Sequence, residues 1–301
     1  MKKEHPGVPG GGALRAKEAM EWIMKTVFLV CGFIAIAFVL LITVYLIISG
    51  LPAIREVGLT DFLFGTRWAS TDPAYGILPF ILTSIYGTAG AILIGVPIGF
   101  LTAVFLSKVA PPKVAAVIRP AVDLLAGIPS VVYGLVGMMV LLPAIRKTFD
   151  IAAGDSLLAA IIVLAVMILP SIISVSETAL NAVPREYEEA SLALGATELE
   201  TYFRVSVPAA KSGIAAAVVL GVGRAIGEAM AILMVAGNVA NMPSLLSSVK
   251  FLPTAIASEM SYAAVGSLQR NALYSIGLIL FLFIMCINVI LNVFLKRNKE
   301  G

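Results

Sequence analysis

The sequence has little charge. Only 13% of its 301 residues are Asp, Glu, Lys or Arg, whereas about a quarter of an ordinary soluble domain is charged. Hydrophobic residues make up 59% of the chain. This composition excludes a water-soluble globular domain, and no segment between the apolar stretches is long enough to hold one. We expect an integral membrane protein.

Residues that commonly carry out chemistry are also scarce. Cys31 and Cys286 both fall within apolar stretches and fit neither a disulfide framework nor a metal motif, so we interpret them as packing residues. The single histidine, His5, lies near the N-terminus, which excludes a Ser/His dyad inside the membrane. No glycine-rich phosphate loop is present. We expect no catalytic residue, cofactor or metal, no nucleic-acid binding, and any nucleotide on another chain.

The chain contains several long runs without a charged residue. Five of them reach or exceed the roughly 20 residues that cross a bilayer: Thr26–Ile54, Pro73–Ser107, Leu124–Ile145, Ser156–Ser176 and Asn271–Leu295. A sixth run, 212–249, contains only Arg224 and Glu228 as charged residues, and we interpret it as one span followed by part of a loop. These runs predict an all-α polytopic membrane protein with six transmembrane helices. Residues 26–54 form the first helix, and 1–25 and 296–301 are tails, the first with a flexible glycine-rich segment, 7–12.

Lysine and arginine are distributed unevenly between the two sides, and positively charged loops stay in the cytoplasm. With both termini inside, the cytoplasmic segments hold fourteen of these residues: Lys2, Lys3, Arg15, Lys17, Lys25, Lys108, Lys113, Arg119, Arg185, Arg204, Lys211, Lys296, Arg297 and Lys299. The outer loops hold six: Arg55, Arg67, Arg146, Lys147, Lys250 and Arg270. An even number of spans agrees with this orientation.

The polar loop after the fourth run carries clear helix signals. Pro184 suits a first helical turn, and Gly195 suits the position just past a helix end. Thr197 with Glu200 three residues later forms a capping box for a second helix, which Pro208 ends or kinks. The pattern predicts two short helices on the cytoplasmic side.

This helical pair also carries apolar residues that no other part of the chain is expected to cover. Alanines that permit close approach accompany large side chains: Ala190, Ala193, Ala196, Leu192, Leu194, Tyr202 and Phe203. An uncovered apolar surface of this kind indicates a docking site for a partner.

The spacing within this loop resembles a known family. Glu189-Ala190-Ser191, three residues, Gly195, nine residues and then Val205-Ser206-Val207-Pro208 resembles the EAA loop of binding-protein-dependent ABC import permeases. Ser191 replaces an alanine of that pattern, and two valines replace Ile and Leu. In that family the loop docks into the ATPase subunit. The resemblance therefore implies that residues 183–208 are a coupling loop, with Glu189, Ala190, Gly195 and Pro208 as coupling residues.

Two further stretches are similar to phosphate importer permeases. They are Gly127-Ile-Pro-Ser-Val-Val-Tyr-Gly134 and Gly221-Val-Gly-Arg-Ala-Ile-Gly-Glu-Ala-Met-Ala231, and the second, followed by Gly237-Asn238, resembles the PstC family rather than the PstA family. The resemblance implies a type I importer (MetI-like) core of five helices in residues 77–295. It also implies a substrate path with Arg224, Glu228, Ser130 and Asn238.

The same resemblance implies a set of partners and a location. The partners are a sister permease, two ATPase subunits, an extracytoplasmic phosphate-binding protein and membrane lipid. The location is the plasma (inner) membrane of a bacterium or archaeon, crossed several times. The chain itself is then a non-catalytic subunit, and ATP is hydrolysed elsewhere.

Arg224 and Glu228 are the charged residues of the sixth run. An ionised side chain in a bilayer is costly, by about 2.5–3.5 kcal/mol on insertion scales, so it usually pairs or lines a watered cavity. The i, i+4 spacing puts the two residues on one helix face. Arg224 then either offers its guanidinium to an oxyanion while Glu228 holds it, or forms a structural ion pair with Glu228. A proton relay through Glu228 is a third interpretation.

The glycines near these charges also have two interpretations. Gly221, Gly223 and Gly227 either allow close helix packing or leave an opening beside Arg224. Gly127 and Pro129 mark either a fixed bend or a moving gate.

Other functions are compatible with parts of the pattern. A related oxyanion such as molybdate or sulfate fits the same mechanism. A gradient-driven carrier or channel could use Arg224 and Glu228, although it would not need a docking loop. An intramembrane enzyme and a structural anchor are weaker hypotheses, because the spans hold no catalytic pair and an anchor would not keep charge in the membrane.

Overall fold

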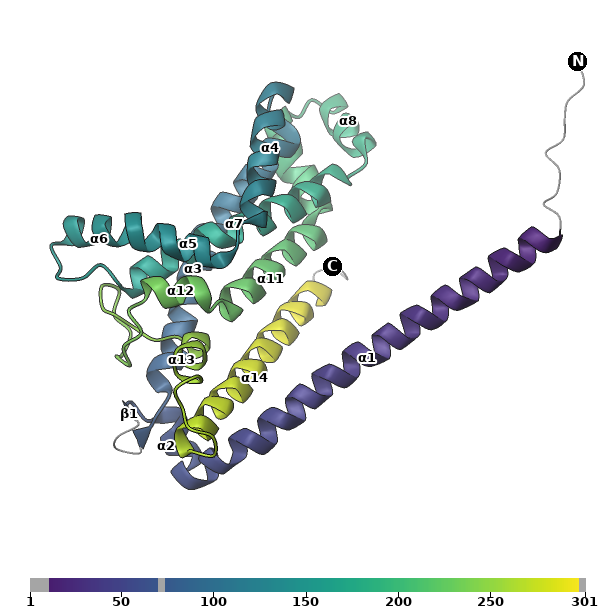
Figure 1. The fold of residues 1–301 in the computed structure, drawn as a ribbon. Helices are drawn as coiled ribbons and strands as arrows, with labels where there is room; N and C mark the ends of the chain where they lie inside the picture. The colour runs from purple at the N-terminus through teal and green to yellow at the C-terminus, as the bar shows by residue number, and fades with distance from the viewer. Residues whose placement is uncertain (1–10, 70–73, 298–301) are drawn as a thin grey trace, which may run out of the picture.

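The computed structural model describes residues 11–69 and 74–297, and this part of the chain is mostly helical (Figure 1). Within these described residues, five segments are long and apolar enough to cross a membrane: Ala19–Val57, Leu78–Val109, Ser130–Phe149, Leu157–Asn181 and Leu268–Leu291. A bent pair, Glu198–Ala209 with Lys211–Gly227, adds a sixth if it counts as one span. The expected all-α, multi-pass fold is therefore confirmed, with five or six spans.

The long helices are α1 (Gly11–Val57), α3 (Leu78–Val104), α7 (Leu157–Asn181) and α14 (Leu268–Arg297). The shorter ones are α2 (Leu59–Phe64), α4 (Pro112–Gly127), α5 (Ser130–Val136), α6 (Leu142–Phe149), α8 (Arg185–Ala193), α9 (Glu198–Thr201), α10 (Val207–Ala209), α11 (Lys211–Gly227), α12 (Met230–Val235) and α13 (Leu252–Glu259). Three π-helical segments interrupt them: η1 (Phe105–Val109), η2 (Gly137–Leu141) and η3 (Tyr202–Ser206). A two-stranded antiparallel hairpin joins β1 (Trp68–Ala69) and β2 (Ala74–Tyr75).

The centre of the molecule is the packing of α3 and α11 against α7, which carries most of the main hydrophobic core. Glycines on α3 face isoleucines on α7. A Cβ added to Gly90, Gly95 or Gly99 would lie 2.7–2.9 Å from Ile161, Ile168 or Ile172, respectively. Lipid is as apolar as these side chains, so helices in a membrane associate through close packing rather than a hydrophobic drive. The glycines make that close approach possible.

Helix α1 packs along α14 near its C-terminal end and stands away from the rest of the molecule over most of its length (Figure 1). Gly50 marks the close contact, because its carbonyl oxygen accepts a 2.6 Å hydrogen bond from the Ser275 hydroxyl. Cys31 on α1 and Cys286 on α14 are both exposed, so the interpretation of them as packing residues is wrong within this chain. Helix α1 already begins at Gly11, so Gly11 and Gly12 of the segment predicted to be flexible, 7–12, are helical, and the rest of that segment lies outside the described residues.

Two predicted spans are interrupted in the structure. The run Leu124–Ile145 is divided, because Ile128 has an extended backbone before Pro129, and the spanning segment is Ser130–Phe149. The helix of the sixth run ends at Gly227, and a separate short helix, α12, follows. Both breaks lie beside glycine or proline, which weaken a helix.

Candidate functional site: the coupling loop and the end of α11

The coupling loop forms the two-part helical structure expected from its local signals. Helix α8 follows Pro184 directly and ends before Gly195, whose φ of +89° lies in the left-handed region. The capping box of Thr197 and Glu200 is present in both directions at the start of α9. The helical path continues through η3 and α10, and then bends by 72° at Ala210 into α11. The predicted helix end, cap and kink are confirmed.

The outer surface of the coupling loop is apolar and uncovered. Leu194 is 90% exposed and Leu199 is 63% exposed, and Leu192 and Phe203 are each nearly half exposed. Tyr202 differs from the expectation, since it is only partly exposed. Glu189, Ala190, Gly195 and Pro208 are all exposed. The structure thus presents the four predicted coupling residues and an apolar patch on one loop.

The inner side of the coupling loop is attached to the membrane helices through Glu188, the residue before the predicted Glu189. Glu188 Oε1 lies 2.6 Å from Lys108 Nζ on η1 and accepts a 2.7 Å hydrogen bond from the Ser206 hydroxyl on η3. The side chains of Lys108 and Glu188 are only 11% and 18% exposed. Glu188 therefore joins α8 to η3 of the same loop and to η1, which is distant in sequence.

The charge on Glu188 is favoured by these contacts. Burial raises the pKa of the Glu188 carboxyl, but the hydrogen bonds from Lys108 and Ser206 and the charges of Lys108 and Arg185 together outweigh it, so the pKa is lowered from its ordinary value of 4.5. The carboxylate is consequently ionised at neutral pH.

Within the coupling loop, the family's second alanine is a serine with a structural contact. The Ser191 hydroxyl lies 2.8 Å from the hydroxyl of Thr201, which is fully buried. This hydrogen bond joins α8 to the C-terminal end of α9. It holds the two parts of the coupling loop in one arrangement.

A cavity of about 470 Å³ lies between the coupling loop and the membrane helices. Its walls include Ser107, Lys108, Asn181, Arg185, Glu188, Glu189 and Tyr202. The Ser107 hydroxyl closes one edge by donating a 2.7 Å hydrogen bond to Asn181 Oδ1. The Glu188 contacts thus sit beside a polar hollow rather than in a packed core.

Arg224 lies at the C-terminal end of α11 and does not pair with Glu228. Its Nη1 donates a 3.3 Å hydrogen bond to the Ser171 hydroxyl on α7. Glu228 is beyond the helix end, in an extended conformation, and its Oε1 accepts a 2.9 Å hydrogen bond from the backbone N–H of Ala231. Among the described residues no salt bridge joins Arg224 to Glu228. The prediction that both residues share one helix face is wrong.

The helix ends at this place for a local reason. Three glycines in the last seven residues of α11 lower its helix propensity, each by about 1 kcal/mol relative to alanine. Glu228 then serves the next helix, since a carboxylate at a helix N-terminus pairs with its free N–H groups. The structure thereby separates the two charges, and within residues 11–69 and 74–297 Arg224 has no carboxylate partner.

The glycines around Arg224 have different surroundings. A Cβ on Gly221 would lie 3.1 Å from Ile172, so this glycine packs against α7. Gly223 and Gly227 have no atom within 4 Å of that position, so they border open space. The packing interpretation holds for Gly221, whereas a substrate-sized opening beside Arg224 stays a prediction.

Ser130 and Asn238 are placed at the ends of neighbouring helices. Ser130 is the first residue of α5 and is partly exposed. Helix α5 packs closely on α12, where a Cβ on Gly134 would lie 2.9 Å from the Ala231 backbone. Asn238 has a φ of +58°, and its side-chain amide donates a 2.7 Å hydrogen bond to the Leu233 carbonyl, closing the end of α12. Its Oδ1 is buried without a partner.

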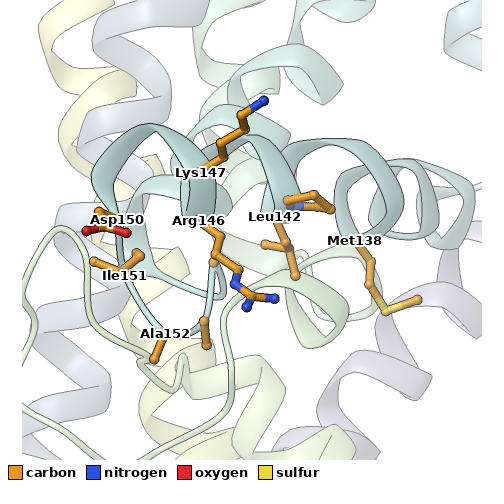
Figure 2. Close-up of a pocket in the computed structure, with 10 residues that line it drawn as sticks. Met138, Leu142, Arg146, Lys147, Asp150, Ile151 and Ala152 are labelled. Carbon is orange, nitrogen blue, oxygen red and sulfur yellow. The ribbon is translucent and has the colours of Figure 1, made fainter.

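A second hollow, of about 900 Å³, lies around α6 and the turn that follows it. Figure 2 shows Arg146 extending toward the side on which Ala152 lies, while Lys147 extends away from it. None of the predicted site residues lines this hollow. The hollow is formed by η2, α6 and the turn after α6, and neither Arg224 nor a residue of the coupling loop lines it.

Sequence comparison relates the chain to membrane transport components. Residues 95–300 match the family described as binding-protein-dependent transport system inner membrane component. The probable ABC transporter permease protein YqgH of Bacillus subtilis is 43% identical over 266 residues, covering 85% of this chain and 86% of that protein. The phosphate transport system permease protein PstC of Haemophilus influenzae is 34% identical, with 89% and 91% covered. The probable PstC of Methanocaldococcus jannaschii is 31% identical, with 88% and 90% covered.

Solved structures show the same fold. A chain of a bacterial ABC transporter that imports alginate superposes with a TM-score of 0.65 at 14% identity, covering 95% of this chain and 99% of that one. A chain of the inward-facing MetNI methionine transporter gives a TM-score of 0.55 at 20% identity, with 74% and 94% covered. The MetI-like permease fold expected from the sequence is confirmed.

Proposed function

Because the chain belongs to the family of binding-protein-dependent transport system inner membrane components, we propose that it is a permease subunit of an ATP-driven importer of inorganic phosphate. The curated relatives named PstC support the substrate class, since they resemble this chain over most of its length. In this proposal the chain forms a translocation path with a sister permease similar to PstA.

The single observation that carries the proposal is the coupling loop. Its exposed apolar patch, with Leu194 90% exposed, needs a partner surface. Its rigid shape suits a lever, because the capping box, the left-handed Gly195 and the Ser191–Thr201 hydrogen bond hold α8 and α9 in a defined arrangement. We assign the partner as an ATPase subunit similar to PstB, two of which serve one permease pair, with Glu189, Ala190, Gly195 and Pro208 at the contact.

Arg224 supplies the charge for an oxyanion in this proposal. A guanidinium has five N–H donors, and Ser171 accepts one of them. The planar fork that remains suits two oxygens of a phosphate. Gly223 and Gly227 leave open space beside it, and Ser130 and Asn238 lie at the ends of adjacent elements. Glu228 acts as the cap of α12 and so maintains the break that presents Arg224.

The distribution of positive charge supports an orientation with both termini and the coupling loop in the cytoplasm. The similarity to phosphate permeases supports a phosphate-binding protein similar to PstS that delivers the anion from outside. Such a subunit needs no ATP site of its own, because the ATPase chains supply the energy.

Two experiments test the proposal. Gentle co-purification of the full chain from its native membrane should bring down an ATPase and a second permease of similar size. Uptake of radiolabelled phosphate into vesicles with the purified complex should require ATP, and unlabelled phosphate should compete better than molybdate or sulfate. Failure of phosphate to compete would remove the substrate assignment, and uptake by the chain alone that uncouplers abolish would indicate a gradient-driven carrier.

A further inference from the structure

Glu188, Lys108 and Ser206, which we call the Glu188 junction, tie α8 of the coupling loop to η1, at the end of α3, and to η3, the segment of the loop that leads into α11. We propose that Glu188 is a positioning residue that transmits movement of the coupling loop to α3 and α11 during transport. This inference rests on the proposed function and deepens it, because it names the contact inside the permease through which docking would reach the substrate path.

The contacts of the junction are short and converge on one atom. Lys108 Nζ and the Ser206 hydroxyl lie 2.6 Å and 2.7 Å from Glu188 Oε1. Hydrogen bonds with a charged partner are roughly twice as strong as those between neutral groups. A displacement of α8 therefore acts on both partners at once.

The two partners lie on different routes into the membrane. Lys108 is on η1, which continues α3 without a break, and α3 is packed along α7. Ser206 is the last residue of η3, and α10 and the bend at Ala210 lead from it into α11, which ends near Arg224. The junction thus connects the exposed face of α8 with the helix that carries the proposed anion ligand.

Both partner segments are π-helical. A π-helical turn interrupts the regular α-helical hydrogen bonding and is frequently found at functional sites. Here η1 and η3 present Lys108 and Ser206 to the same carboxylate oxygen. The interruptions allow these two helices to meet α8 at one point.

Other contacts of the coupling loop do not provide this connection. The Ser191–Thr201 hydrogen bond joins α8 to α9 and contacts neither Lys108 on η1 nor Ser206 at the end of η3. The nearby apolar cluster packs Val183 and Ala210 against Ala103 and Val104, but the hydrophobic force that holds it is non-directional. The junction adds charge-assisted hydrogen bonds, which fix the direction of the contact.

The test compares single and paired substitutions in the full complex reconstituted into vesicles. The measured quantity is radiolabelled phosphate taken up per ATP hydrolysed, with co-purification of the ATPase as the measure of assembly. Glu188→Gln and Lys108→Met should retain the ATPase and lower the ratio about tenfold or more, the scale set by loss of a charge-assisted hydrogen bond. The charge exchange Lys108→Glu with Glu188→Lys should recover part of the ratio.

Glu186→Gln is the matched control, because Glu186 is in the first turn of α8 and exposed. It removes one negative charge from the same helix and should leave the ratio unchanged. An unchanged ratio in Glu188→Gln, or an equal loss in Glu186→Gln, would overturn the role of the junction. If the Glu188→Gln complex does not assemble, Ser206→Ala is the deciding variant, because it removes only the hydrogen bond from Ser206 to Glu188. An unchanged ratio in Ser206→Ala would then overturn the role of the junction.

The two proposals fail in different ways. A wild-type complex that does not take up phosphate contradicts the proposed function. A wild-type complex that transports phosphate, with variants of unchanged ratio, contradicts only the Glu188 junction.

Discussion

Gly195 shows how one residue determines the shape of the coupling loop. Its φ of +89° is one that side chains with a Cβ rarely adopt, and nothing lies within 4 Å of the position a Cβ would take. The requirement for glycine therefore comes from the backbone and not from a neighbour.

The first prediction is that Gly195→Val will reduce docking of the ATPase. A left-handed conformation costs about 1–2 kcal/mol for residues with a Cβ, and a β-branched side chain is the least tolerant. Co-purification of the ATPase and phosphate uptake should both fall, while the subunit still inserts into the membrane. Gly195→Asn is the control, because asparagine tolerates this conformation. Equal uptake by the valine variant and the wild type would remove the docking role.

At the same scale, Arg224 has no carboxylate partner within the described residues. The second prediction is that Arg224→Gln abolishes phosphate uptake and retains assembly. Breaking a buried ion pair would cost about 3–5 kcal/mol, because it strands a charge, but here no opposite charge is left behind. Arg224→Lys should transport poorly, since it loses the planar fork. Dissociation of the complex in Arg224→Gln would favour a structural role with the sister permease instead.

At the scale of the element, α8 is held in place by the carboxylate of Glu188, whose pKa is lowered from its ordinary value. A group of this kind stabilises the folded state at pH values above its unfolded pKa, and this contribution is lost as pH falls through the lower, folded value. For Glu188 the loss therefore begins near the ordinary value of 4.5 and continues below it. Attachment of α8 should thus be independent of pH around neutrality.

The third prediction concerns this pH dependence. Amide hydrogen exchange in α8 of the detergent-purified chain, after correction for the intrinsic effect of pH, should show constant protection between pH 8 and about 5. Protection should then fall as pH drops through and below about 4.5. In Glu188→Gln the change should be smaller, because the titrating group is missing. An identical pH profile in wild type and variant would show that another group is responsible.

At the scale of the whole molecule, the orientation of the chain in the membrane is a proposal that can be tested. The coupling loop and the loop before α14 lie on opposite sides of the membrane if the positive-charge distribution is followed. Leu194 in the first and Tyr262 in the second are 90% and 87% exposed, so both are accessible positions.

The fourth prediction is that cysteines at these positions will be labelled from opposite sides. In a chain with Cys31→Ala and Cys286→Ala, Tyr262→Cys should react with a membrane-impermeant thiol reagent added to intact cells. Leu194→Cys should react only after the membrane is opened or in inside-out vesicles. The reverse pattern would invert the proposed topology and place the coupling loop outside, where no ATP-hydrolysing partner could reach it.

Local features of the site could be predicted from the sequence, and distant contacts could not. The Thr197–Glu200 cap and the stop at Gly195 depend on residues three or four positions apart, and both are present. Lys108 and Glu188 are eighty positions apart, with no local pattern to connect them. The supposed Arg224–Glu228 pair had the right spacing for a helix, but the helix ends between them. The glycines of α11 are the feature of the sequence that could have indicated this helix end.

The sequence by itself determined that this chain is a multi-pass helical membrane protein with a capped, kinked loop that resembles a coupling element. These properties depend on hydrophobic length and on interactions within one or two helical turns, which the order of residues specifies directly. Only the tertiary structure decided that Glu188 rather than Glu189 is anchored to the membrane helices, and that Arg224 faces Ser171 while Glu228 caps α12. Those contacts depend on where the packed helices bring separate segments together. The packing therefore decides which of several possible partners lies within hydrogen-bond distance of each charged side chain.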